Sequence, residues 1–128
     1  MAANQRRTSQ RRAIEQAIEE TDRPLTPAEV HTVARKVVPA LGMATVYRAL
    51  RALLEKGWLR PVKIPGEPQR YEVAGKDHHH HFHCRGCDRV FEVDGCPGQM
   101  RALTPKGFKL EGHELVLYGR CPACRKAK

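Results

Sequence analysis

Two pairs of cysteines have the spacing of a metal site. Cys84 and Cys87 form the first pair, and Cys121 and Cys124 form the second. Two residues separate the members of each pair, so one turn can present both sulfurs to a single ion, and four thiolates are the complete tetrahedral ligand set of a closed zinc site. Two redox-active dithiols are the alternative, but they would need a βαβ context that the sequence does not show. We therefore expect a structural Zn²⁺ ion that joins the beginning and the end of the C-terminal half.

A run of histidines lies directly before the first cysteine pair. Five of the seven histidines fall within residues 78–83. They are surplus to a four-thiolate site and suggest a second metal with a different role. In an extended segment alternate side chains point to opposite faces, so His79 and His81 share one face while His78 and His80 share the other. One strand can then supply ligands to two separate metal sites.

Residues elsewhere in the chain can complete these two sets of histidines. Glu72 and Glu92 offer oxygen ligands for the first histidine pair, and His113 is a candidate partner for the second histidine pair. An expression tag is an alternative source of four consecutive histidines, but this run is internal and adjoins the cysteines. Cys96 is unpaired and precedes a Pro-Gly turn, which favours a bystander over a ligand or a redox switch.

The composition favours a nucleic-acid partner. The 128 residues include 23 basic and 14 acidic side chains, which gives a net charge of +9. Such an excess favours binding to a polyanion, most commonly nucleic acid, although a merely soluble basic surface is the alternative. No apolar run is long enough to span a bilayer, and no signal-peptide core follows the N-terminal charges. The sequence therefore predicts a cytoplasmic protein with no membrane partner.

Helical signals in the first half indicate a helix-turn-helix. A first helix should begin near residues 8–9 and end before Pro24. A capping box over residues 26–29 opens a second helix, which Pro39 should end. A third helix is expected over residues 44–56. Two short helices separated by a tight turn, the second with an exposed polar face, are typical of a helix-turn-helix.

Two short strands and a polar helix face complete a predicted DNA-binding unit. Residues 58–62 and 70–73 flank a Pro-Gly turn and would form the wing of a winged helix. The exposed face of the third helix and a basic N-terminal cluster can contact bases and phosphates, and simple solvation of these side chains is the alternative. The candidate DNA contacts are Arg6, Arg7, Thr45, Tyr47, Arg48 and Arg51. Together with the net charge, they make double-stranded DNA the better interpretation.

The predicted fold class is α+β, with two domains. We expect a winged helix-turn-helix DNA-binding domain over residues 1–74, a hinge over residues 75–77 and a small α/β dimerisation domain with the structural zinc site over residues 78–128. The elements expected in the last domain are strands over 89–93, 109–110 and 114–118 and a helix over 98–104. So few elements cannot bury a sizeable core, and we expect zinc and a twofold partner to stabilise this domain.

Three motifs, in this order, resemble the ferric uptake regulator family. They are ATVYRAL at residues 44–50, HHHHFHCRGC at residues 78–87 and HELVLYGRCPAC at residues 113–124. The resemblance covers nearly the whole chain. It implies a homodimeric, metal-responsive repressor that has an N-terminal winged helix and a C-terminal dimerisation domain, and in which Tyr47 and Arg48 read the operator.

The resemblance also implies how the ligands are shared among three sites. These are a structural zinc site of Cys84, Cys87, Cys121 and Cys124, a regulatory hinge site of Glu72, His79, His81 and Glu92, and a second site of His78, His80 and His113. A hinge metal would tie the wing to the dimer core and fix the separation of the two DNA-reading helices. Four nitrogen and oxygen ligands fit Zn²⁺, and added water would suit Fe²⁺ or Mn²⁺, so the regulatory metal stays open among these three.

The predicted function is a metal-dependent DNA-binding transcriptional regulator, acting as a repressor of metal-uptake or homeostasis genes and not as an enzyme with a small-molecule substrate. A peroxide-responsive regulator of the same family is one alternative. A zinc enzyme acting on nucleic acid is another, but the chain has no His-x-Glu motif, and four thiolates leave no coordination position for water. A zinc ribbon that binds protein is the third, and the helix-turn-helix counts against it.

Overall fold

A computed structural model of the chain describes residues 2–76, 78–96, 98 and 100–126, with side chains from Arg7 onward. The chain divides into two compact units, residues 1–76 and residues 77–128, and each unit has its own small sheet. Within the described residues, no helix combines the length and the apolar character needed to cross a membrane.

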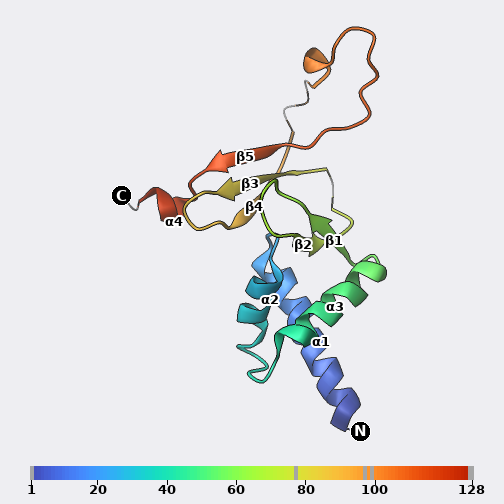
Figure 1. Ribbon diagram of the computed structural model, residues 1–128, viewed down its shortest axis with the longest axis vertical. Coiled ribbons are helices and arrows are strands. Elements are labelled where there is room, and N and C mark those ends of the chain that lie inside the picture. Colours follow the sequence, from blue (N-terminus) through green and yellow to red (C-terminus); the bar gives the residue numbers. More distant parts are fainter. Residues whose placement is uncertain (1, 77, 97, 99, 127–128) are drawn as a thin grey trace. The chain divides into compact units, whose positions relative to one another are not determined.

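The first unit consists of three helices followed by an antiparallel hairpin (Figure 1). Its elements in order are α1 (Ala2–Thr21), α2 (Pro27–Ala34), α3 (Met43–Glu55), β1 (Leu59–Val62) and β2 (Arg70–Val73). Leu59 pairs with Val73 and Val62 with Arg70 across the hairpin. The helix-turn-helix of α2 and α3 and the wing of β1 and β2 confirm the predicted winged helix.

The start of α2 follows from a local signal that the sequence contains. The Glu29 backbone N–H donates to Thr26 Oγ1 over 3.1 Å, and the Thr26 backbone N–H donates to the Glu29 carboxylate over 3.0 Å. These two bonds form the predicted capping box. The helix ends at Ala34 and not at Pro39, because the backbone N–H of Val37 bonds the Ala34 carbonyl three residues back and so tightens the chain into a turn.

The first helix is longer than predicted. It begins at Ala2 and not near residues 8–9. Residues 2–7 contain neither proline nor glycine, and alanine, glutamine and arginine in this segment all favour a helix. The prediction placed the start at the first apolar stripe and so missed a polar extension that carries the N-terminal arginines.

A single apolar core holds the first unit together. Ile14 and Ile18 of α1, Val30 of α2, and Val46 and Leu50 of α3 are each at most 2% exposed. They belong to a continuous cluster of thirteen buried residues, to which the wing contributes Leu59. Burying one such aliphatic side chain stabilises a fold by about 1.5–3 kcal/mol. The first unit therefore has a hydrophobic core that needs no metal.

The second unit is built on a three-stranded sheet of order β4-β3-β5. Its elements are β3 (His80–Cys84), β4 (Val90–Val93), the 3₁₀ helix η1 (Met100–Leu103), β5 (Val116–Gly119) and α4 (Pro122–Arg125). The central strand β3 is antiparallel to β4 and parallel to β5. Between β4 and β5 the chain makes a long excursion that carries η1 (Figure 1). The α and β elements of the two units confirm the α+β class.

This excursion has less regular structure than predicted. Residues 109–110 form no strand, the last strand begins at Val116, and the helix expected over 98–104 is the short 3₁₀ segment Met100–Leu103. Pro105 and Gly107 disfavour both a longer helix and a strand here. Among its described apolar side chains, the second unit buries Cys84, Val90 and Cys121. Its apolar core is therefore very small, and two of these three residues are cysteines.

Candidate metal centres and nucleic-acid interface

The four cysteines of the second unit lie together. One ligand atom from each of Cys84, Cys87, Cys121 and Cys124 lies within 4.8 Å of all the others. Cys87 Sγ is 3.9 Å from Cys121 Sγ. A tetrahedral zinc ion with Zn–S bonds of about 2.3 Å would place neighbouring sulfurs about 3.8 Å apart. The cluster therefore fits a structural Zn²⁺ ion.

The sheet and one glycine bring the two cysteine pairs together. Cys84 ends β3 and is paired with Gly119 on the parallel strand β5, which leads directly to the second pair. The Cys121 backbone N–H donates to Cys84 Sγ over 3.3 Å. A Cβ atom added to Gly86 would lie 2.8 Å from both Cβ and Sγ of Cys124, closer than real Cβ contacts allow. Glycine at position 86 is therefore needed for the close approach of the two pairs.

Hydrogen bonding favours a thiolate at one position of this cluster. The backbone N–H of Cys121, with further backbone amides, lowers the pKa of Cys84 to about 6 although burial opposes ionisation. Hydrogen bonds with the sulfurs of Cys84 and Cys121, together with burial, raise the pKa of Cys124 to about 12. Zinc binds thiolates, so an ion at the centre would take the place of the protons that these thiols share.

A second group of ligand atoms is formed by the three histidines predicted for the second site. His78 Nε2 is 3.1 Å from His80 Nε2, and both atoms are 3.2 Å from His113 Nε2. Each Nε2 atom has one N–H bond or one lone pair in the ring plane. In a nearly equilateral triangle, the single N–H bond or lone pair of each Nε2 atom cannot be directed at both neighbouring nitrogens. The arrangement fits a common ligand at its centre better than mutual hydrogen bonds.

Cys96 belongs to the same group, contrary to the prediction of a bystander in a turn. Its Sγ lies 3.1 Å from His113 Nε2, and one ligand atom from each of the four residues lies within 4.8 Å of the others. Sequence reasoning missed this placement because the thiol comes from the irregular segment after β4, where no periodicity assigns a direction. An odd cysteine in a chain rich in histidine was the available signal.

Burial differs among the members of this second group. His80 is 2% exposed, His113 is half-buried, and His78 and Cys96 are exposed. Burial, with a smaller contribution from the positive charges that His78 and His113 can carry, lowers the pKa of His80. The neutral imidazole that results is the form that binds a metal ion.

Three of the four predicted hinge ligands share one face of the second unit. His81 is paired with Glu92 across β3 and β4, and side chains directly opposite in an antiparallel pair lie on the same face. His79 lies two residues before His81, and the centroids of the two rings are 5.0 Å apart. The fourth residue, Glu72, belongs to β2 of the first unit, where its Oε1 lies 3.2 Å from Arg60 Nε.

The exposed face of α3 carries the predicted DNA contacts. Val46 and Leu50 occupy the buried face of this helix, which turns Tyr47, Arg48 and Arg51 outward. Tyr47 is 56% exposed, a large value for an aromatic side chain. The Arg48 guanidinium donates to the Thr45 hydroxyl over 3.2 Å, which holds these two polar groups side by side.

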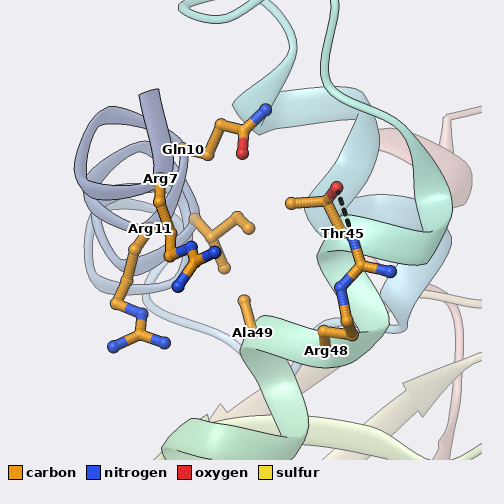
Figure 2. A pocket seen from close by; sticks show the side chains of 7 residues that line it. Arg7, Gln10, Arg11, Thr45, Arg48 and Ala49 are labelled. Carbon is orange, nitrogen blue, oxygen red and sulfur yellow. Dashed lines mark hydrogen bonds between the residues drawn. The ribbon is translucent and has the colours of Figure 1, made fainter. Parts of the chain in front are cut away.

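Two grooves flank this helix. The first, of about 550 Å³, lies between α1 and α3 and is lined by Arg7, Gln10, Arg11, Ile14, Thr45, Arg48 and Ala49. Figure 2 shows the Arg7 side chain extending from α1 toward α3, where Arg48 and Thr45 stand. The second groove, of about 410 Å³, includes Tyr47, Arg48 and Arg51 in its lining. Arg48 borders both grooves, and the guanidinium groups give this surface the positive charge that attracts phosphates.

The side chain of Arg7, one of the predicted DNA contacts, therefore lies beside the exposed face of α3. The predicted contact at Arg6 concerns a side chain outside the described residues. Arg11, which belongs to the basic N-terminal cluster expected to contact phosphates, lines the same groove, and so does Gln10, which was not predicted as a DNA contact. The helical spacing of Gln10 from Arg7 could have indicated it, because residues three and four positions apart lie on one helix face.

Comparisons with known proteins agree with this arrangement. Residues 2–118 match the Ferric uptake regulator family. The ferric uptake regulation protein of Campylobacter jejuni subsp. jejuni is 33% identical over 126 residues, which cover 94% of this chain and 80% of that protein. The structure of a zinc-bound manganese uptake regulator is 28% identical, with a TM-score of 0.79 over 88% of this chain and 87% of that one.

A structure of the ferric uptake regulator from Francisella tularensis with iron is also 28% identical, with a TM-score of 0.69 over 91% of this chain and 92% of that one. One of these two relatives, named for manganese uptake, is thus zinc-bound, and the other is a structure with iron. The family match over most of the chain, the relative at 33% identity and the shared fold lead to one conclusion. The chain belongs to the ferric uptake regulator family of transcriptional regulators.

Proposed function

We propose that this protein is a metal-dependent DNA-binding repressor of metal-uptake or homeostasis genes, activated by a divalent ion at a hinge site. The ligands of that site are Glu72, His79, His81 and Glu92. One observation carries the proposal: three of these ligands share a face of the second unit, and the fourth belongs to the wing of the DNA-binding unit. An ion that uses all four would join the unit that binds metal to the unit that binds DNA.

The mechanism is a shift between populations of unit arrangements. The proposed mechanism requires that the two units can adopt more than one relative orientation when no ion is bound. An ion bound to ligands from both units selects one of them. In a homodimer this fixes the separation of the two α3 helices, so that both reach half-sites one helical turn of DNA, or a multiple of it, apart. The bound metal ion thus strengthens operator binding although the ion itself does not contact the DNA.

The DNA interface would combine phosphate contacts with base contacts. Arg6 and Arg7 on α1 would neutralise phosphates and add affinity that is independent of sequence. Thr45, Tyr47, Arg48 and Arg51 on α3 would enter the major groove, where Arg forms bidentate hydrogen bonds to guanine. The position of Arg48 between the two grooves supports its role at the centre of this contact.

Apolar surface on the second unit supports the proposed homodimer. Large hydrophobic side chains are exposed there although the unit buries few of its own. They are Leu103, Phe108, Leu110, Leu117 and Tyr118. A second copy that covers them would supply the core that this unit lacks, and twofold pairing of identical surfaces is the commonest solution.

The chemistry of the ligands limits the regulatory metal to a few ions. Two imidazoles and two carboxylates fit tetrahedral Zn²⁺, and with added water they suit six-coordinate Fe²⁺ or Mn²⁺. His78, His80 and His113 would form a second metal site on the other face of the same segment. The four-thiolate cluster has no open coordination position for a water molecule, which supports a structural and not a catalytic role for its zinc.

Replacing Glu72 tests the link between metal and DNA. The DNA is a duplex selected from a random library by the wild-type protein with metal, and affinity is measured by fluorescence anisotropy with Zn²⁺, Fe²⁺ or Mn²⁺ added one at a time. We expect the active metal to raise wild-type affinity by roughly 5- to 150-fold, the usual range of allosteric coupling. Glu72→Ala should abolish most of this increase while the protein stays folded and dimeric.

Arg60→Ala is the matched control. It breaks the same ion pair with Glu72 from the other side but leaves the carboxylate in place for a metal. We expect its metal dependence to match that of the wild type, whatever it does to the absolute affinity. A Glu72→Ala protein whose DNA affinity still rises as much with metal as that of the wild type would contradict the hinge mechanism.

A further inference from the structure

We propose that Cys96 is the fourth ligand of the second metal site, which makes it a three-histidine, one-thiolate site for zinc. The inference rests on the second site proposed above and adds both a ligand and a metal preference to it. Two observations carry it: the triangle of three Nε2 atoms, and a thiol from a separate segment of the chain that lies 3.1 Å from one of these atoms and within 4.8 Å of the other ligand atoms.

The distances match a tetrahedral zinc site. With Zn–N bonds of about 2.0–2.1 Å, neighbouring nitrogen ligands lie about 3.3–3.4 Å apart. The three Nε2 separations, 3.1, 3.2 and 3.2 Å, are close to this edge length and form one face of the tetrahedron. The Sγ of Cys96 lies 3.1 Å from His113 Nε2 and within 4.8 Å of the other ligand atoms, which is near enough for it to take the remaining corner when an ion binds.

The local backbone explains how the thiol reaches this corner. Cys96 lies three residues beyond β4, directly after Gly95. Gly95 has a φ of 95°, a conformation that other residues rarely adopt, and it lies in the irregular segment that follows the strand. An ion at this site would join three separate segments: the start of β3 with the residues just before it, the segment after β4 and the segment before β5.

A thiolate at this corner changes which metals the site prefers. Thiolate and imidazole ligands favour zinc, whereas carboxylate and water ligands favour manganese. No carboxylate of the described residues belongs to this group of ligand atoms. Four protein ligands also complete the coordination of Zn²⁺ without water. We therefore assign zinc, or another borderline divalent ion such as Co²⁺, to this site.

The exposure of its ligands indicates that this zinc exchanges more readily than the zinc on the four cysteines. Two ligands of this site, His78 and Cys96, are exposed, whereas the four-cysteine cluster has one exposed ligand, Cys87, and two buried ones, Cys84 and Cys121. Ligands at the surface are open to solvent and to competing thiols. Occupancy of the second site would then follow the available zinc, and the bound ion would order the excursion between β4 and β5.

Cobalt spectroscopy tests the thiolate directly. The full-length protein, loaded with one zinc per chain on the four cysteines and kept reduced, is titrated with Co²⁺. A thiolate ligand gives an intense sulfur-to-cobalt charge-transfer band that nitrogen and oxygen ligands do not give. We expect this band in the wild type, and weaker than in protein whose four-cysteine site itself holds cobalt. Cys96→Ser should lose the band, and His113→Ala, which removes a neighbouring ligand, should lose or strongly weaken it.

Control variants separate this proposal from the proposed function. Asp94→Asn changes a carboxylate of the same turn and should leave the band intact. Glu72→Ala, which tests the hinge site, should also leave it intact, so the two proposals can fail independently. As a second readout, Zn²⁺ should slow alkylation of Cys96 by roughly 10-fold or more, because a metal-bound thiolate is shielded from the reagent, and His113→Ala should remove this protection.

Several results would overturn the assignment of Cys96 as a zinc ligand. A band that persists in Cys96→Ser would come from cobalt on the four cysteines. Cobalt bound with d–d absorption but no charge-transfer band in the wild type would mean that no site outside the four cysteines uses the thiolate. Absence of any cobalt-dependent absorption, or alkylation of Cys96 that Zn²⁺ does not slow, would also reject the proposal.

Discussion

The two units of this protein are stabilised in different ways. The first unit surrounds a cluster of thirteen buried residues, most of them from its three helices, together with Leu25, Leu41 and the wing residue Leu59. In the second unit, the buried apolar side chains among its described residues are Cys84, Val90 and Cys121. The second unit instead contains ligand clusters, one of four cysteines and one of three histidines and Cys96. One unit is held by apolar packing, and the other depends on metal coordination.

This difference separates two tasks within one regulator. A helix that reads DNA must keep its shape whether or not the signal is present, and a hydrophobic core provides that constancy. A unit that responds to metal gains from a fold in which metal ligands occupy the sheet itself, because binding is then coupled to structure. The following predictions test this division, from the largest expected effect to the smallest.

Breaking the four-cysteine cluster should have the largest effect. We expect Cys121→Ser to remove the structural zinc and to unfold the second unit, because structural zinc contributes about 10–16 kcal/mol of apparent binding free energy in small domains. Elemental analysis should show the loss of one zinc per chain. Two-dimensional NMR should show collapsed dispersion for residues 78–126 while signals of the first unit persist.

Cys96→Ser is the matched control for this substitution. It makes the same change at a cysteine outside the four-cysteine cluster and should leave the second unit folded. Unfolding of the first unit together with the second in Cys121→Ser would show that the two units do not have separate sources of stability.

Removing a core side chain should affect the first unit alone. Leu50 is 1% exposed, and Leu50→Ala should lower the free energy of unfolding of the first unit by about 2–5 kcal/mol because it leaves a cavity. Chemical denaturation monitored by the fluorescence of Trp58 measures this change. Val37→Ala, at a position that is 68% exposed, should change it by less than about 0.5 kcal/mol. A loss of bound zinc in Leu50→Ala would contradict independent stabilisation.

A substitution on the exposed side of α3 should separate DNA affinity from the metal response. Arg48→Ala should lower DNA affinity by about 1–3 kcal/mol, or roughly 5- to 150-fold. The substitution removes the guanidinium group that borders both grooves of the protein and that is proposed to contact the DNA. The reduction should be the same factor with and without the activating metal. A variant that altered the metal response itself would show that Arg48 takes part in coupling and not only in contact.

The smallest expected effect concerns the cap of α2. Thr26→Ala removes the hydroxyl that accepts the Glu29 N–H and should destabilise the first unit by about 1 kcal/mol. Thr32→Ala removes a hydroxyl from the same helix, where it bonds the Ala28 carbonyl, and should have almost no effect. Thermal unfolding of the first unit compares the two variants. Equal shifts of the unfolding temperature in the two variants would mean that the capping box adds no measurable stability.

The sequence allowed much of the first unit to be predicted, because its signals are local. The capping box at Thr26 fixed the start of α2, and the spacing of Val46 and Leu50 identified the buried face of α3. The N-terminal extension of α1 was missed because a polar helix has no apolar stripe to mark it. Only the intrinsic helix propensity of its residues indicates that such a segment is helical, and helix propensity is a weak guide.

In the second unit, too, features that depend on local sequence patterns could be predicted, and features that depend on distant parts of the chain could not. The Cys-x-x-Cys spacing and the alternation of histidines are local patterns, and they are enough to group most of the ligands. Cys96 could not be placed, because its position depends on the turn at Gly95 and on the path of an irregular excursion. The strand expected at 109–110 failed for the same reason, since glycine and proline near it remove the regular pattern.

Hydrogen exchange of the intact protein tests the central contrast most directly. Protection is measured with the structural zinc in place and after its removal by a strong chelator under reducing conditions. We predict that amides of β3, β4 and β5 lose their protection without zinc, while amides around Val46 and Leu50 in α3 keep theirs. Retained protection of β3 and β5 in zinc-free protein, or simultaneous loss in both units, would contradict the account.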